Sequence, residues 1–240
     1  MEIQPRHVLC ILHHAALSVR EISGRFPWFE YDAEYSVSQP DARMEKAFLA
    51  SADRVEPSMT DADWQAIQEH TVVSYVLSPR LTPANSLEVS RQALALIAAC
   101  LEAGALAVKG ESSGIAHGRK RWLQLNAKAA ESLEASLIRA WVRLPIYSAP
   151  VHYCVGMHLL GGTDVEVAHE QLSEPEIVDT IMAFLHFLLI DKPKNLASGH
   201  AFRVSADATR FRMFPSQCTR YEPDDFFYNP YGYWRLIPIV

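Results

Sequence analysis

Three side chains capable of acid–base and nucleophilic chemistry, Glu111, Ser113 and His117, lie within one glycine-rich loop of the sequence. The loop follows a short apolar run, and in open α/β sheets ligands bind at the carboxyl ends of such core strands. A serine activated by a histidine that a carboxylate orients needs only these residue types, but closeness in sequence does not supply the geometry of a triad. The pattern therefore favours a structural loop that caps a helix starting near Arg119. The alternative is an enzyme or small-molecule-binding domain that uses the 110–118 loop as its pocket.

The common catalytic signatures are absent from the chain. It contains no Gly-x-Ser-x-Gly elbow, no phosphate-binding loop, no dinucleotide-binding glycine fingerprint and no His-Glu-x-x-His pair. We therefore expect a protein that is not an enzyme.

Two segments combine aromatic and acidic residues, Trp28 to Tyr35 and Tyr221 to Trp234. In the first the two types alternate, which is typical of an amphipathic strand with its rings packed inward; the second has no regular period and would then be a core-plugging arm. In the other interpretation both are recognition surfaces, with rigid aromatic anchors in a negative field. On that interpretation the steering charges are Glu30, Asp32, Glu34, Glu222, Asp224 and Asp225, and the anchors are Trp28, Tyr31 and Tyr228.

Histidine and cysteine side chains share one face of the strand expected at 151–160, namely His152, Cys154 and His158. Their spacing is wider than that of usual zinc ligands, and the four cysteines of the chain form no Cys-x-x-Cys pair. We expect buried free thiols, no metal and no organic cofactor.

Composition and charge restrict the class of partner. The 240 residues carry a formal net charge of −6, which speaks against direct binding of nucleic acid and is compatible with a basic protein partner. No apolar run approaches the 18 or so residues of a membrane span, and the first residues lack the pattern of a secretory signal. A cytoplasmic protein without membrane contact is the expectation.

The elements that position these residues follow from periodicity. Strands are predicted at 7–12, 71–77 and 105–108, and the last two should run parallel on either side of a helix near 86–103 that begins with a capping box at Asn85. Further helices are predicted at 120–140 and at 174–190, after a second capping box at Ser173, and further strands at 141–147, 151–160, 165–167, 199–204 and 210–214. The fold class predicted is a single α+β domain, a mixed β-sheet flanked by long amphipathic helices. The alternative organisation is two packed halves, 1–118 and 119–240.

A family resemblance spans nearly the whole chain. It rests on Trp64, on the stretch from Ala99 to Val108, on the loop from Gly110 to Gly118 with Trp122, and on the segment from Gly156 to Gly161. In these features the chain resembles immunity protein family 52 of bacterial polymorphic-toxin and type VI secretion systems. The resemblance implies an immunity protein that neutralises a restriction-endonuclease-like DNase toxin by binding it in the producing cell. It implies no enzymatic residues. A strand rich in Gly-Met and Leu-Gly before an acidic hairpin is also similar to a bacterial domain of unknown function.

Overall fold

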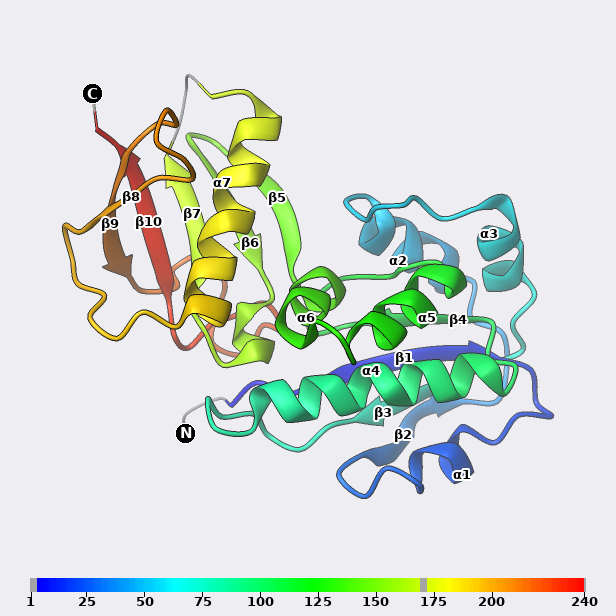
Figure 1. Ribbon diagram of the computed structural model, residues 1–240. Coiled ribbons are helices and arrows are strands. Elements are labelled where there is room, and N and C mark those ends of the chain that lie inside the picture. The colour runs from blue at the N-terminus through cyan, green and yellow to red at the C-terminus, as the bar shows by residue number, and fades with distance from the viewer. Residues whose placement is uncertain (1–3, 169–171, 240) are drawn as a thin grey trace.

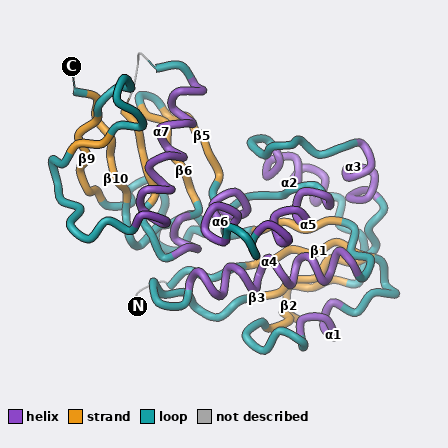
Figure 2. Tube along the Cα trace, in the orientation of Figure 1, coloured by secondary structure: helices purple, strands orange, loops and turns teal. Residues whose placement is uncertain are grey.

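Two β-sheets with helices packed on them make up the structure, which confirms the predicted α+β fold class (Figure 1). The computed structural model describes residues 4–168 and 172–239. Sheet A belongs to the first half of the chain and sheet B to the second half, as the tube drawing shows (Figure 2). None of the described helices is both long and apolar enough to span a bilayer.

Sheet A has four strands in the order β2-β3-β1-β4. They are β1 (Val8–His13), β2 (Glu30–Val37), β3 (Val72–Leu77) and β4 (Ala107–Gly110). Since β3 and β4 both pair antiparallel with β1, they run in the same direction, as predicted. They are not neighbours, because the apolar β1 strand lies between them and is buried on both faces.

Helices cover both faces of sheet A. The long α4 (Ser86–Glu102) packs on one face, with α1 (Val19–Ser23) beside it, whereas α2 (Arg43–Ala52) and α3 (Asp61–Gln68) lie over the other. The capping box predicted at Asn85 is wrong, because the Asn85 carboxamide accepts from the Thr82 amide instead of capping the helix. Thr60 and Ser173 do form capping boxes, at the starts of α3 and α7 (Glu174–His186).

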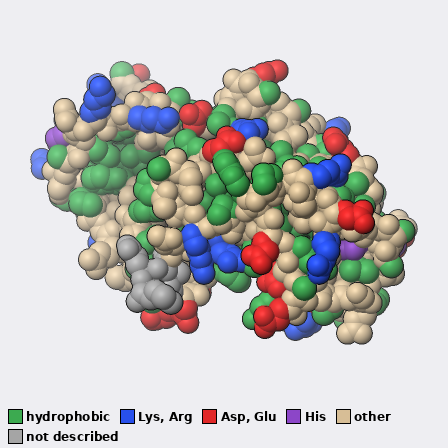
Figure 3. Space-filling model, turned by 90° about the horizontal axis from the view of Figure 1, so that it is seen from below, with side chains coloured by type: hydrophobic (Ala, Val, Ile, Leu, Met, Phe, Trp, Pro, Cys, Tyr) green, Lys and Arg blue, Asp and Glu red, His purple; other side chains and the backbone are tan. Residues whose placement is uncertain are grey.

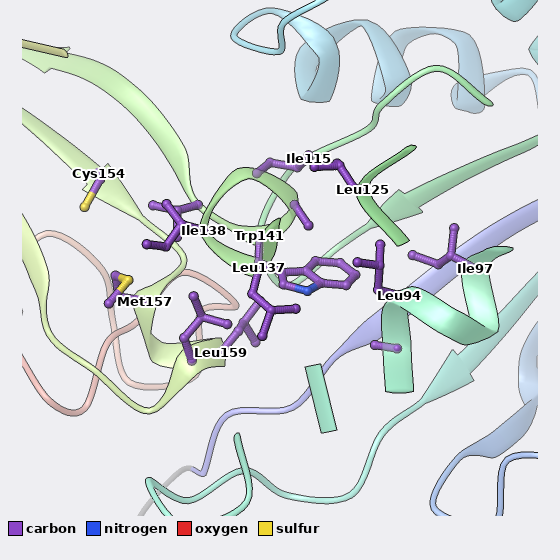
Figure 4. Packing of buried hydrophobic residues seen from close by; sticks show 14 of the residues in the cluster. Leu94, Ile97, Ile115, Leu125, Leu137, Ile138, Trp141, Cys154, Met157 and Leu159 are labelled. Atoms are coloured by element: carbon purple, nitrogen blue, oxygen red, sulfur yellow. The ribbon is translucent and has the colours of Figure 1, made fainter. Parts of the chain in front are cut away.

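The helix predicted over 120–140 is in fact two, α5 (Arg119–Lys128) and α6 (Leu133–Trp141). The break at residues 129–132 changes the direction of the chain, and both helices pack against α4. Figure 4 shows the consequence, with the indole of Trp141 directed toward Leu94 of α4 in the centre of the core. The same cluster includes Cys154 and Met157 from the second half of the chain, so the core is continuous between the two sheets.

Sheet B has six strands in the order β5-β6-β7-β10-β9-β8. They are β5 (Arg143–Ser148), β6 (Val151–Val155), β7 (Asp164–Ala168), β8 (Ala201–Phe202), β9 (Phe211–Ser216) and β10 (Tyr233–Pro238). The continuous strand predicted over 151–160 is wrong: β6 ends at Val155, and a 3-10 turn (Met157–Leu160) follows. The cause is Gly156, which has φ +130° and lies so close to the Trp141 carbonyl that a Cβ atom would be 2.0 Å from that oxygen.

The β10 strand was not predicted, because it lies at the end of the aromatic tail. It pairs parallel with β7 and antiparallel with β9, and so holds sheet B together. Helix α7, continued by a π-turn (Phe187–Asp191), covers one face of this sheet with its apolar stripe. The other face is covered in part by the irregular arm 217–232, through contacts of Tyr221 and Phe227 with Tyr153 and Tyr233.

Candidate functional site

A mainly apolar cavity of about 560 Å³ lies between sheet A and the C-terminal arm. Its residues come from six separate parts of the chain. They are Gln4, Pro5, Arg6 and Val8; Asp32 and Tyr35; Tyr75, Leu77 and Arg80; Glu111 and Ser112; His158; and Asp224, Asp225, Phe226 and Tyr228.

Strand pairing builds the floor of the cavity. Val8 pairs with Leu77 and Asp32 pairs with Tyr75, so these four lining residues share one face of sheet A. Cys10 and Lys109 continue the row of Asp32 and Tyr75 across the sheet. Helix α2 covers the centre of the row, where the Cys10 thiol contacts the Met44 sulfur at 3.9 Å. The cavity lies toward the end of the sheet beyond Tyr75, where Val8 and Leu77 pair.

The segment Asp224–Tyr228 of the C-terminal arm supplies another part of the lining. The Asp225 carboxylate accepts a hydrogen bond from the Phe227 amide at 2.7 Å, which holds the segment in a turn. Phe227 is directed inward, to Tyr221, while Phe226 points outward and is 54% exposed. The turn therefore presents two carboxylates and an exposed ring beside the cavity.

Four carboxylates and two guanidinium groups line the cavity. Burial and the nearby Arg80 lower the pKa of Arg6, and the charges of Glu30 and Asp32 oppose this effect. Glu111 pairs with the buried Lys109 at 2.8 Å. Burial lowers the pKa of His158 to about 4, so this ring is neutral at pH 7 and adds no positive charge. The excess of acids favours a cationic or basic ligand.

Charges of both signs are mixed on one face of the molecule. On the face of the molecule seen in Figure 3, acidic and basic side chains lie in small separate groups, with hydrophobic residues between them and no broad field of one sign.

The structure brings parts of the two predicted recognition segments together. Asp32 from the first segment and Asp224, Asp225 and Tyr228 from the second line the same cavity, although about 190 residues of sequence separate them. Other members lie around it or away from it. Glu30, Glu34 and Glu222 are exposed, Trp28 is 49% exposed outside the cavity, and Tyr31 packs toward the core beneath the Arg20 guanidinium.

The inward packing expected for the rings of the first segment is thus wrong for Trp28 and for Tyr35, which is 67% exposed. Trp28 precedes β2, whereas Tyr35 belongs to β2, which is an edge strand with an irregular register after Asp32. Its outer residues have no facing element to pack against.

The three residues of the alternative pocket face different neighbours. Glu111 reaches the cavity, but the buried Ser113 hydroxyl donates to the Gly110 carbonyl at 3.3 Å. His117 is buried against Trp122, and its Nε2 atom donates to a backbone carbonyl at 3.1 Å. Among the described residues, therefore, these side chains form no serine–histidine–carboxylate chain.

Several cavity residues were not predicted. Ser112 lies between Glu111 and Ser113 in the 110–118 loop, and Tyr35 and Phe226 belong to the aromatic segments. Arg6 and Tyr75 carry no sequence signal, because only the pairing of β1, β2 and β3 places them together.

Comparison of the chain with protein-family models, with curated proteins and with solved structures found no match. The resemblance to immunity protein family 52 thus stays a prediction.

Proposed function

We propose that this protein is an immunity protein that binds a cognate nuclease toxin and blocks its DNA-binding or active-site cleft. The observation that carries the proposal is the convergence of two acidic, aromatic segments on one cavity. A cleft that binds DNA must attract phosphates and is therefore basic, so an acidic surface with apolar anchors is complementary to it.

The carboxylates beside the cavity are available to a partner. Among the described residues, neither Glu222 nor Asp224 forms a salt bridge, and the hydrogen bonds of Asp32 and Asp225 come from backbone amides of their own turns. Tyr35 and Phe226 add exposed rings of the kind that dominates the energetics of protein interfaces. The charges steer the encounter, and the rings supply apolar area.

Co-expression with the toxin encoded beside this protein tests the proposal. We expect the cells to survive and the two proteins to co-purify. Replacement of both Asp224 and Asp225 by lysine should weaken capture at least about tenfold at low salt, because two attractive charges become repulsive. A matched control with the same change in net charge replaces the exposed Glu102 and Asp207 by lysine, away from the cavity.

A second test addresses the apolar part of the surface. Phe226→Ala removes an exposed ring at the cavity, and a ring at the centre of an interface is worth about 2 kcal/mol or more, or about thirtyfold in Kd. Leu49→Ala, at an exposed position on α2, is the control. Cell death despite co-expression, or equal weakening by the cavity and control variants, would refute the proposed function.

The volume of the cavity supports one other candidate, a small-molecule-binding domain. Pockets of about 300–1,000 Å³ are usual for such ligands, and Glu111 from the 110–118 loop faces the interior. A compound that raises the melting temperature of the wild type and not of Glu111→Gln, combined with no toxin capture, would favour this function.

A further inference from the structure

A second cavity, of about 380 Å³, lies on the face of sheet B that is turned away from α7. Cross-strand pairing sets its floor, because Tyr153 of β6, Glu166 of β7 and Arg235 of β10 form one row across three adjacent strands. The arm that follows β9 closes one side with Arg220 and Tyr221. This cavity is separate from the toxin-binding site proposed above, and the inference does not depend on that function.

Glu166 fixes two guanidinium groups at this cavity. The residue is 2% exposed, and each of its two carboxylate oxygens accepts from a different arginine: Oε2 from Arg220 Nη2 at 2.7 Å and Oε1 from Arg235 Nε. The Arg220 guanidinium also lies over the Tyr153 ring, 4.5 Å from its centroid. Both arginines are thus held in defined positions, although their side chains remain 24% and 48% exposed.

The two guanidinium groups retain unused donors. Each bonds Glu166 through one nitrogen, and among the described residues no other acceptor takes the remaining N–H groups. The charged groups of the described lining are one carboxylate and two guanidiniums, which leaves the cavity with a positive charge in a chain whose net charge is −6. Hydroxyl and amide groups supply the rest of its polar surface: Ser148, Tyr153, Ser216, Gln217, Thr219, Tyr221 and Tyr233.

We propose that this cavity binds the carboxylate or phosphate group of a small, polar molecule between Arg220 and Arg235. Planar guanidinium forks match the geometry of both anions, and fixing the forks in advance reduces the entropy lost on binding. The surrounding hydroxyls suit a ligand that carries hydroxyl groups of its own.

Titration with inorganic phosphate and, separately, with acetate, followed by calorimetry at low salt, tests the proposal. We expect Arg235→Gln to weaken binding at least about tenfold, through loss of one charged fork. Glu166→Gln should instead strengthen binding about tenfold, because it removes the competing carboxylate and leaves both guanidiniums free. The exposed Arg212→Gln, on β9 outside the cavity, is the control for net charge and should leave affinity unchanged.

Opposite changes in anion affinity in Arg235→Gln and Glu166→Gln distinguish a ligand site from a purely structural ion pair. A structural role predicts that neither anion binds the wild type, and that outcome overturns the proposal, as does equal weakening by Arg235→Gln and Arg212→Gln. If circular dichroism shows that Glu166→Gln does not fold, the difference in anion affinity between Arg235→Gln and Arg212→Gln tests the proposal. Tighter binding of phosphate than of acetate would assign a phosphate-bearing ligand, and the reverse order a carboxylate.

Discussion

Acidification from pH 7.5 to pH 5 should destabilise this protein through three buried histidines, His7, His117 and His158. Burial lowers their pKa values to about 3, about 3 and about 4, from an ordinary value of 6.5. Each ring donates its Nε2 hydrogen to a protein oxygen: His7 to Ser90 Oγ at 2.8 Å, His117 to the Arg139 carbonyl at 3.1 Å and His158 to the Ser112 carbonyl at 3.1 Å. The folded protein therefore holds all three rings neutral.

The sign of the effect follows from linkage between protonation and folding. A histidine whose pKa is lowered on folding costs nothing above pH 6.5, and it destabilises the fold as the pH falls below 6.5, because only the unfolded chain takes up the proton. At pH 5 the cost is about 2 kcal/mol for each ring, or about 6 kcal/mol for the three.

Asp164 acts in the opposite direction. Burial raises its pKa from 3.8 to about 7, although the Asn229 amide and the Met157 backbone N–H donate to the carboxylate. A raised carboxyl pKa means that stability is lost as the pH rises from about 4 to about 7, so acidification from pH 7.5 to pH 5 restores about 2.5 kcal/mol. The expected net loss is about 3 to 4 kcal/mol, a large share of the 5–15 kcal/mol typical of a domain.

Urea unfolding at pH 7.5, 6.5, 5.5 and 5.0, followed by tryptophan fluorescence, measures this loss. His117→Gln keeps a donor near the position of Nε2 but cannot take up a proton, so its free energy of unfolding should fall by about 2 kcal/mol less than that of the wild type. His14→Gln changes an exposed ring and should follow the wild type. A free energy of unfolding that is independent of pH, or an equal fall in the wild type and His117→Gln, would refute the reasoning.

Three further predictions concern buried groups. The free energy of unfolding of the wild type, relative to that of Asp164→Asn, should be about 3 kcal/mol lower at pH 8 than at pH 5. A difference in urea midpoints that is the same at both pH values would contradict the raised pKa of Asp164. Gly156→Ala should lower the free energy of unfolding by at least about 3 kcal/mol, because the added Cβ would lie 2.0 Å from the Trp141 carbonyl oxygen. Gly104→Ala should lower it by only about 1 to 2 kcal/mol in the same assay, because Gly104 has φ +106° and no heavy atom lies within 4 Å of the added Cβ. Trp122→Phe should destabilise the fold by about 1 to 2 kcal/mol more than Trp141→Phe does. The reason is that the Trp122 indole donates to the Val108 carbonyl at 3.1 Å, whereas the Trp141 indole N–H has no partner among the described residues. Similar melting temperatures for the two variants would show that the hydrogen bond contributes little.

The sequence alone determined the elements whose signal is local. The apolar run at β1, the strand at 72–77 and the amphipathic helix at 86–102 were predicted close to their observed bounds, and Ser173 begins α7 as its capping box indicates. Each of these depends on residues within a few positions of one another, which is the range over which periodicity and capping act.

Tertiary contacts decided the elements and the site that have no local sequence signal. The break between α5 and α6 allows both to pack on α4, and β10 forms because β7 and β9 lie on either side of it, so neither feature has a clear local pattern. The candidate site has the same origin. The sequence marked Asp32 and Asp224 as members of two acidic, aromatic segments, but only the pairing of strands in sheet A and the return of the C-terminal arm bring them to one cavity. Contacts between residues so far apart in the chain depend on the packing of the whole core, which local periodicity does not encode.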